Sequence, residues 1–201
     1  LVLRHGKTEW NALGLLQGRT DVPLSVAGQA EVRRWRCPLD FANANVVSSP
    51  LSRAKETALI LFADRVTKSN LRLDENLVEM SFGNFEGQSA EDYQIFSRSG
   101  GEEWRGLDFA APGGETLRQV QKRVQTFLEL AATYVDHENR CIVVSHKAWI
   151  YALFSLAWSW SFDKKPPQKI DFAAAHEFVV DINSAGAQSL RLVKINRSLI
   201  V

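Results

Sequence analysis

The segment Cys141–Val144 constrains the fold of this 201-residue chain more than any other segment. Its four residues are all apolar and lack the alternation of apolar and polar positions that marks a half-exposed strand. Such a run is typical of a strand buried on both faces, as in a parallel sheet that helices cover on each side. The segment therefore predicts an α/β protein.

Strands and helices are predicted to alternate along the chain. Four short strands are expected, at 1–3, 46–48, 71–73 and 141–144. Four helices are expected, at about 25–36, 50–64, 115–134 and 147–158. Two more strands, near 177–182 and 188–194 with Gly186 in the loop between them, are expected to form a hairpin. This order predicts a three-layer α/β/α sandwich with a mostly parallel central sheet.

Proline and glycine mark the ends of these elements. Ser25 is predicted to cap the first of these helices and Pro38 to end it, whereas Pro50 suits a first helical position. The least regular stretch lies at about 84–113, where glycine and proline indicate loops. A chain of this length fits one domain over residues 1–201, so we expect this stretch to be a small lid or insertion.

Composition excludes several classes of function. A net charge of +1 gives no general attraction for nucleic acid or acidic membranes, and no apolar run reaches membrane-spanning length. We expect no signal peptide before the first strand. The two cysteines, Cys37 and Cys141, have no metal-ligand spacing and make a poor disulfide framework, which favours a reducing, cytoplasmic compartment. We expect neither a bound metal nor a cofactor.

Charged side chains follow the predicted strands at the point where each strand ends. Arg4 and His5 follow the first strand, and His146 follows the strand at 141–144. Arg53 and Glu79 come shortly after two other strands. In an open α/β sheet the carboxyl ends of the strands form the ligand site. These five residues are therefore predicted to share one site, with Gly6 allowing a ligand to approach the backbone.

These residue types suit the chemistry of phosphate esters. Arginine offers a planar fork of donors for phosphate oxygens, and a histidine nitrogen can attack phosphorus. Two arginines beside His5 should lower its pKa and keep that nitrogen unprotonated, while its other nitrogen donates to a backbone carbonyl. His146, if protonated, would be a further donor, and Glu79 could protonate the leaving oxygen.

The segment Arg4–Asn11, with the sequence RHGKTEWN, resembles the signature of the histidine phosphatase superfamily, the phosphoglycerate-mutase-like proteins. The resemblance extends over nearly the whole chain. The other segments that carry it are Gln17–Gly18, Ser48–Ala54, Glu79 with Gly83–Gly87, Pro112–Glu115 and Val144–His146.

The resemblance implies a phosphohistidine mechanism without metal. His5 would be the nucleophile, and Glu79 would be first the acid and then the base that activates water. The phosphate pocket would consist of Arg4, Arg53 and His146. Asn11, Gln17 and Gly18 match positions that touch phosphate or substrate in the family. Many members have glycine where this chain has Lys147, which either adds a positive charge for the substrate or points into solvent.

The sequence favours a phosphatase acting on small phosphomonoesters over a phosphoglycerate mutase. The mutases carry a lysine and paired arginines after the acid, but no lysine occurs between Asn84 and Gln121, and Arg98 and Arg105 are not adjacent. A non-catalytic phosphate-binding protein is the third alternative. The substrate stays open among α-ribazole phosphate, sugar phosphates, phosphoserine and phosphoproteins.

Several residues have structural interpretations instead. His137 is expected on the surface, and His176 is expected to be structural. The apolar segment Trp149–Phe154 predicts a buried helix; the alternative is a homodimer interface that uses Trp158 and Trp160. Four aromatic residues of the predicted lid either roof the site or form a small core of their own: Tyr93, Phe96, Trp104 and Phe109.

Overall fold

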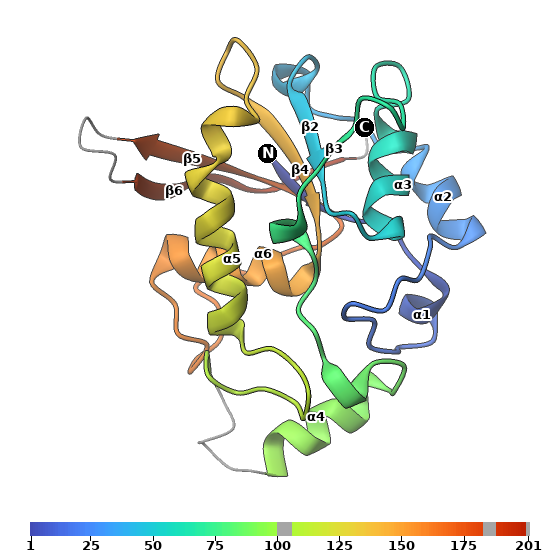
Figure 1. The fold of residues 1–201 in the computed structure, drawn as a ribbon, viewed down its shortest axis with the longest axis vertical. Helices are drawn as coiled ribbons and strands as arrows, with labels where there is room; N and C mark the ends of the chain where they lie inside the picture. The colour runs from blue at the N-terminus through green and yellow to red at the C-terminus, as the bar shows by residue number, and fades with distance from the viewer. Residues whose placement is uncertain (100–105, 183–187, 200–201) are drawn as a thin grey trace.

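The computed structural model describes residues 1–99, 106–182 and 188–199, and it contains a six-stranded sheet in the order β3-β2-β4-β1-β5-β6 (Figure 1). The strands are β1 Val2–Arg4, β2 Asn45–Ser48, β3 Arg72–Leu73, β4 Cys141–Ser145, β5 Ala175–Ile182 and β6 Gln188–Arg197. The first four run parallel, β5 is antiparallel to β1, and β6 is antiparallel to β5. The mostly parallel sheet and the final hairpin are confirmed. Gly186 lies outside the described residues.

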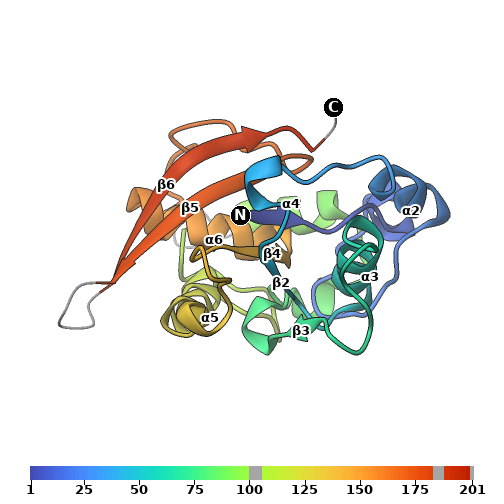
Figure 2. The same ribbon diagram turned by 90° about the horizontal axis from the view of Figure 1, so that it is seen from above.

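Helices cover both faces of the sheet. They are α1 Glu9–Ala12, α2 Val26–Val32, α3 Ser52–Leu61, α4 Ala90–Ser99, α5 Leu117–Glu129 and α6 Lys147–Trp158. Seen from above, α2 and α3 lie on one side of the sheet and α5 and α6 on the other (Figure 2). The three-layer architecture is confirmed. Within the described ranges, no helix is both long enough and apolar enough to cross a bilayer.

Alternate residues of the central strands build two separate cores. Leu3 and Val144 pack in the core that also holds residues of α2 and α3. Val2 and Val143 point to the opposite face and pack with residues of α5 and α6. Because successive side chains of a strand face opposite ways, a strand buried on both faces must be apolar throughout. The apolar composition of Cys141–Val144 has this physical cause.

Two predicted helices end earlier in the structure, each where a side chain or backbone group finds a tertiary partner. The helix from Ser25 stops at Val32, before Pro38, and the chain turns so that the Arg36 N–H donates to the carbonyl of Leu199. Helix α3 ends at Leu61 and the next residue, Phe62, is buried in the core.

Two further helix boundaries also differ. Pro50 lies before the helix instead of at its first position, because α3 begins only at Ser52. Helix α5 ends at Glu129, and Tyr134 lies beyond it, where its ring stacks on Phe127 with 5.5 Å between centroids and its hydroxyl donates to Asp74.

The irregular stretch at about 84–113 contains a ten-residue helix, α4, that the sequence analysis missed. In Figure 1 this helix lies at the end of the molecule, away from the strands. Its aromatic side chains pack on Phe85, which precedes the helix: Tyr93 lies edge-on to Phe85 at 5.5 Å, and Phe96 contacts Phe85 at 4.8 Å between ring centroids. Tertiary packing of these rings supports a helix whose sequence carries no strong local signal.

Candidate active site

The parallel pairing of β1 with β4 brings two predicted site histidines together. Arg4 lies opposite Ser145 in the strand register, and the N–H of His5 donates to the carbonyl of Ser145 at 3.1 Å. His146 is the next residue after Ser145, and its ring centroid lies 5.1 Å from that of His5. The prediction that neighbouring strand ends would meet is confirmed for this pair.

His5 is fixed in one tautomer. Its Nδ1 lies 2.7 Å from the carbonyl oxygen of Gly6, and since a carbonyl can only accept, Nδ1 must carry the proton. The Nε2 lone pair is therefore available for attack. Burial and the charges of Arg4 and Arg53 hold the pKa of His5 well below its ordinary value, and only 5% of the residue is exposed. The neutral nucleophile expected from the sequence has a physical basis here.

Gly6 is required for packing. A Cβ at this position would lie 2.5 Å from a methyl carbon of Val32 on α2 and 3.3 Å from Leu24. Its N–H donates to the hydroxyl of Thr57 on α3. The glycine therefore lets α2 and α3 pack against the chain just after His5, while the approach of a ligand to its backbone stays a prediction.

Arg53, on α3, is completely buried and is held by the loop of the predicted phosphate-binding residues. Its guanidinium donates to the carbonyls of Thr20 at 3.0 Å and Gly18 at 2.7 Å. Gly18 has a φ of +53°, and a Cβ there would lie 2.1 Å from Oε1 of Glu86. Only glycine fits the backbone conformation and the contact at this position.

Glu86 has a structural role that the sequence analysis did not single out. Both of its carboxylate oxygens are occupied. It accepts hydrogen bonds from the N–H groups of Arg19, Thr20 and Phe82. Glu86 thereby ties the loop at 17–20 to the segment that follows Glu79.

His146 is fully buried behind His5. Its Nε2 lies 2.8 Å from the hydroxyl oxygen of Ser49, and its Nδ1 has no hydrogen-bond partner in the described part of the chain. Burial, followed by the charge of Arg53, holds the pKa of His146 well below its ordinary value. The protonated form considered from the sequence is therefore disfavoured in the free protein, and a bound anion would have to supply the charge that favours it.

Glu79 lies at the N-terminus of α6. Its Oε1 accepts hydrogen bonds from the N–H of Met80 at 2.9 Å and of Ala148 at 3.1 Å. Ala148 is the second residue of α6, so the carboxylate occupies a position where helix N–H groups are unpaired and the helix dipole favours an anion. The side chain is 7% exposed and reaches the same cavity as His5.

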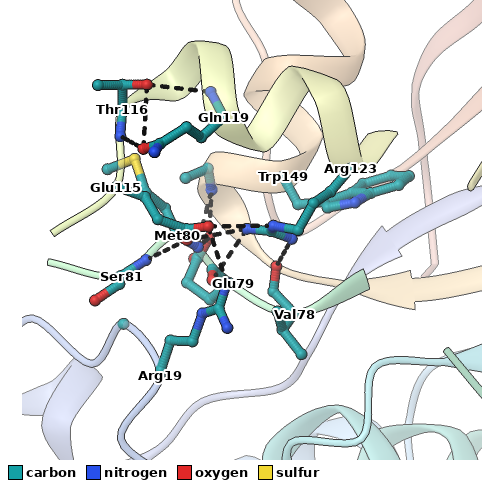
Figure 3. Close-up of polar contacts among 12 residues, drawn as sticks. Arg19, Val78, Glu79, Met80, Ser81, Glu115, Thr116, Gln119, Arg123 and Trp149 are labelled. Carbon is teal, nitrogen blue, oxygen red and sulfur yellow. Dashed lines mark hydrogen bonds and ion pairs between the residues drawn. The ribbon is translucent and has the colours of Figure 1, made fainter. Parts of the chain in front are cut away.

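An ion pair that the sequence analysis did not single out holds the Glu79 segment (Figure 3). Arg123 on α5 donates to the carbonyls of Val78 at 2.9 Å and Glu79 at 3.4 Å, and it pairs with Glu115 at 3.1 Å. Glu115 also accepts the N–H of Ser81 at 2.8 Å. The pair therefore forms hydrogen bonds with the backbone on both sides of Glu79. The only signal in the sequence was Glu115 within the Pro112–Glu115 motif.

The predicted site residues line one cavity of about 550 Å³. Those at its wall are Arg4, His5, Asn11, Gln17, Gly18, Arg53, Glu79 and Lys147. His146 is not at the wall but behind it. Eight of the nine predicted site residues thus share one cavity, and the ninth, His146, contacts the ring of His5 from behind the wall.

Several polar atoms of these residues are buried and have no hydrogen-bond partner among the described residues. They include two donors, Nε of Arg4 and Nε of Arg53, and one acceptor, Oε1 of Gln17. Asn11 uses its side-chain oxygen to cap α1 by accepting the N–H of Thr8 at 3.2 Å, which leaves its NH₂ group as a donor. Buried donors without partners are costly, and an anion bound beside the two arginines would satisfy their free N–H groups.

Both alternatives for the aromatic residues near 84–113 hold in part. Tyr93 lines the cavity, whereas Phe96 and Phe109 contact each other at 6.2 Å within the group of rings on α4. Trp104 and Arg105 lie outside the described residues. In the described part of the chain, no three His, Cys, Asp or Glu side chains are grouped as metal ligands.

Two histidines lie away from the site, as expected. His137 is exposed on the surface. His176 is buried in the fold, where its Nδ1 accepts the N–H of Asn196 and its ring contacts Phe154.

The family model for the histidine phosphatase superfamily (branch 1) matches residues 1–194. The chain belongs to this superfamily. Its similarity to a mycobacterial glucosyl-3-phosphoglycerate phosphatase, solved with VO3, spans 98% of both chains at 25% identity and a TM-score of 0.76. The fold described above is that of a histidine phosphatase.

Curated relatives in this superfamily carry phosphatase and mutase-like names. Fructose-2,6-bisphosphatase TIGAR B of Danio rerio is 38% identical over 132 residues, which cover 64% of this chain and 51% of the relative. Phosphoglycerate mutase-like protein 4 of Arabidopsis thaliana is 34% identical over 168 residues, which cover 78% and 70%. This chain spans about half the length of the TIGAR relatives that it matches.

Proposed function

We propose that this chain hydrolyses small phosphomonoesters through a covalent phosphohistidine on His5. The observation that carries the proposal is the fixed tautomer of His5, which leaves a neutral Nε2 in a cavity that two arginines and one carboxylate share. A buried, oriented nitrogen next to Arg4 and Arg53 is suited to attack a bound phosphoryl group.

The reaction has two steps. In the first, Nε2 of His5 attacks phosphorus, the bond from phosphorus to the ester oxygen breaks, and that oxygen takes a proton from the carboxyl of Glu79. In the second, Glu79 accepts a proton from water, the water oxygen attacks phosphorus, and the bond to Nε2 breaks. Phosphate and alcohol are released, and His5 and Glu79 return to their starting states.

The positive charge that stabilises the transition state comes from Arg4 and Arg53. Two guanidinium groups can bind several oxygens of a single phosphoryl group, and in a buried site each such donor contributes roughly 10²–10³-fold to the rate. This arrangement supports metal-independent catalysis. The segment at about 84–113 is proposed to act as a lid within one domain, because Tyr93 and Gln94 of α4 line the cavity.

Phosphate release from a panel of phosphomonoesters, measured with a chelator present, tests the proposal. We expect release that survives chelation. A parallel assay follows the isomerisation of 3-phosphoglycerate. Isomerisation without release would assign the chain as a mutase. The absence of both activities would favour a phosphate-binding protein.

Substitution of the nucleophile tests the mechanism. We expect His5→Ala to lower kcat/KM by roughly 10⁴-fold or more, because the residue that forms the covalent intermediate is lost. Rapid quenching of the unaltered protein with labelled substrate should trap a phosphoenzyme that is stable in alkali and labile in acid. Full activity in His5→Ala would rule out the phosphohistidine route.

A cytoplasmic location is part of the proposal, and so is a small-molecule phosphomonoester as partner. Cys37 and Cys141 are both free thiols, and burial raises the pKa of each, which makes them unreactive. Trp158 packs on Phe154 at 4.6 Å and Trp160 on Phe162 at 3.8 Å between ring centroids, so these rings have partners within the chain. A homodimer through these tryptophans stays a prediction.

A further inference from the structure

Lys147 places a positive charge in the cavity without an acidic partner. It is the first residue of α6, follows His146 directly, and its side chain lines the cavity. No ion pair or hydrogen bond of its ammonium group is found among the described residues. The carboxylate of Glu79 instead accepts the N–H groups of Met80 and Ala148.

The ammonium group of Lys147 lies over aromatic rings. Its Nζ is 5.9 Å from the ring centroid of Tyr151 and 5.5 Å from that of Phe172. These two rings contact each other edge-on, with 4.8 Å between centroids. Cation–π contacts of this kind hold the amine against one wall of the cavity without neutralising its charge. The positive charge is thus oriented and remains available to an anion.

This position is unfavourable for a cation in the free protein. The N-terminus of a helix carries a partial positive charge, so a lysine in the first turn of α6 is repelled by the helix dipole. Burial and the nearby charge of Arg4 lower the pKa of Lys147, and Glu79 acts in the opposite direction. A positive charge on Lys147 is therefore unfavourable for the free protein, and its presence in the cavity is explained if it binds an anionic group of a ligand.

The wall around Lys147 is apolar. Tyr151, Trp160 and Phe162 line the cavity, and Trp160 and Phe162 pack with 3.8 Å between ring centroids. Tyr93 and Leu117 also line it. The reacting phosphoryl group has Arg4 and Arg53 as its partners in the proposed function. Lys147 is therefore a separate cation on an otherwise apolar wall.

We propose that Lys147 binds a second anionic group, located on the leaving group of the substrate. The preferred substrates are then phosphomonoesters whose leaving group has an apolar or planar face and carries a carboxylate or a second phosphate. This inference rests on the proposed phosphatase function and names the substrate class of that same site. Lys147 thus selects the leaving group, while Arg4 and Arg53 bind the group that is transferred.

Matched aryl phosphates test the charge preference. The probes are carboxyphenyl phosphate and its uncharged analogue carbamoylphenyl phosphate, each as the 3- and 4-isomer, together with phenyl phosphate and 1,3-phenylene bisphosphate. We expect kcat/KM for one carboxylate isomer or the bisphosphate to exceed that of its neutral partner by about 10- to 100-fold. One charge-assisted hydrogen bond supplies a preference of this size. Comparing kcat/KM for the carboxylate isomers with that for the bisphosphate shows which anion is preferred.

Substitutions then assign the preference to Lys147. In Lys147→Gln the ratio of charged to neutral substrate should fall to near one, whereas Lys147→Arg should keep most of it. Lys165→Gln removes an exposed charge that does not line the cavity and should leave the ratio unchanged. The midpoint of thermal unfolding of Lys147→Gln should be equal to or above that of the unaltered protein, because a charge unfavourable to the helix is removed.

The outcomes separate the two proposals. Equal kcat/KM for charged and neutral partners in the unaltered protein would overturn the anion site and leave the phosphatase standing. In Lys147→Gln, kcat/KM could instead fall equally for the charged and the neutral substrates, so that their ratio is unchanged. Lys147 would then bind the transferred phosphoryl group, and this result would also overturn the proposed second anion site. No turnover of any ester would overturn the phosphatase, and with it this inference.

Discussion

His5 and Glu79 face the same cavity but are held in opposite ways. Burial and two arginines lower the pKa of His5, so its neutral form is favoured. Glu79 instead accepts two N–H groups at the N-terminus of α6, and its side chain lines the same cavity. His5 is thus fixed as a hydrogen-bond donor to a carbonyl, whereas Glu79 is fixed as an acceptor, and both face the space in which we expect the substrate to bind.

The substitution Glu79→Gln tests the acid role. Glutamine keeps the shape and a carbonyl oxygen that accepts the same N–H groups, but it cannot donate a carboxyl proton. We expect kcat/KM to fall by about 10²–10⁴-fold for alkyl phosphates, whose leaving oxygen needs a proton. For p-nitrophenyl phosphate, whose leaving group is stable as an anion, we expect a much smaller loss. The measurement is a plot of log kcat/KM against the pKa of the leaving alcohol.

The parameter kcat/KM suits this test because it reports the first chemical step and not the release of phosphate from His5. If Glu79 also activates water, the variant should accumulate phosphoenzyme with p-nitrophenyl phosphate, visible as a burst of p-nitrophenol. Equal losses in kcat/KM for good and poor leaving groups would remove Glu79 from the acid role.

At the scale of elements, the sequence predicted the strand ends well and the helix ends less well. The strand at Cys141–Val144 and the position of His146 follow from local composition, because a fully apolar run has few other environments. The ends of α2 and α5 depend on distant partners, such as the bond from Arg36 to Leu199 and that from Tyr134 to Asp74. Such contacts have no signature in a local window.

In the candidate site too, residues with a local sequence signal were predicted, whereas residues that depend on distant contacts were not. Residues that belong to recognisable motifs, such as His5, Arg53 and Glu79, were found to line one cavity. The residues that hold them, Arg123 and Glu86, were missed, because a charged residue on a helix or a loop is ordinarily solvated. Their roles become visible only when the fold places α5 beside the segment at 76–81.

Helix α5 holds Glu79, the proposed acid, through Arg123, so we expect Arg123→Met to impair catalysis although Arg123 does not line the cavity. We expect kcat/KM to fall by about 10-fold or more for alkyl phosphates and less for p-nitrophenyl phosphate, which is the pattern expected for a displaced Glu79. Arg123→Lys should recover part of the activity. The measurement is the same leaving-group plot as for Glu79→Gln.

A matched control lies on the same helix. Arg118 also forms an ion pair, with Asp108 at 2.5 Å, but both side chains are exposed and neither lines the cavity. Arg118→Met should leave kcat/KM and its dependence on the leaving group unchanged. An Arg123→Met variant that is merely less stable, with normal dependence on the leaving group, would contradict the positioning role.

At the scale of the whole molecule, the fold buries three histidines in regions where a charge is unfavourable. His5 and His146 lie in the site, and His176 lies between the sheet and α6, against Phe154. All three have a pKa below the ordinary value, with burial as the largest cause. The same burial that keeps the nucleophile neutral should therefore make the folded state sensitive to acid.

His176 allows this to be tested outside the active site. Burial lowers its pKa from 6.5 to about 4, with Asp171 acting in the opposite direction. Between these values the unfolded chain binds a proton that the folded chain does not, so the free energy of unfolding falls as the pH is lowered. At pH 5 the loss from this one residue is about 2 kcal/mol, and it falls to nearly zero by pH 7.5.

The substitution His176→Gln removes this titration while its side-chain oxygen can still accept the N–H of Asn196. We expect the fall in unfolding free energy between pH 7.5 and pH 5, measured by urea denaturation, to be smaller by about 2 kcal/mol in the variant than in the unaltered protein. His137→Gln is the control, because that histidine is exposed. If His176→Gln lost as much stability on acidification as the unaltered protein, His176 would titrate normally in the folded state. The remaining acid sensitivity would then belong to His5 and His146, whose burial the catalytic site requires.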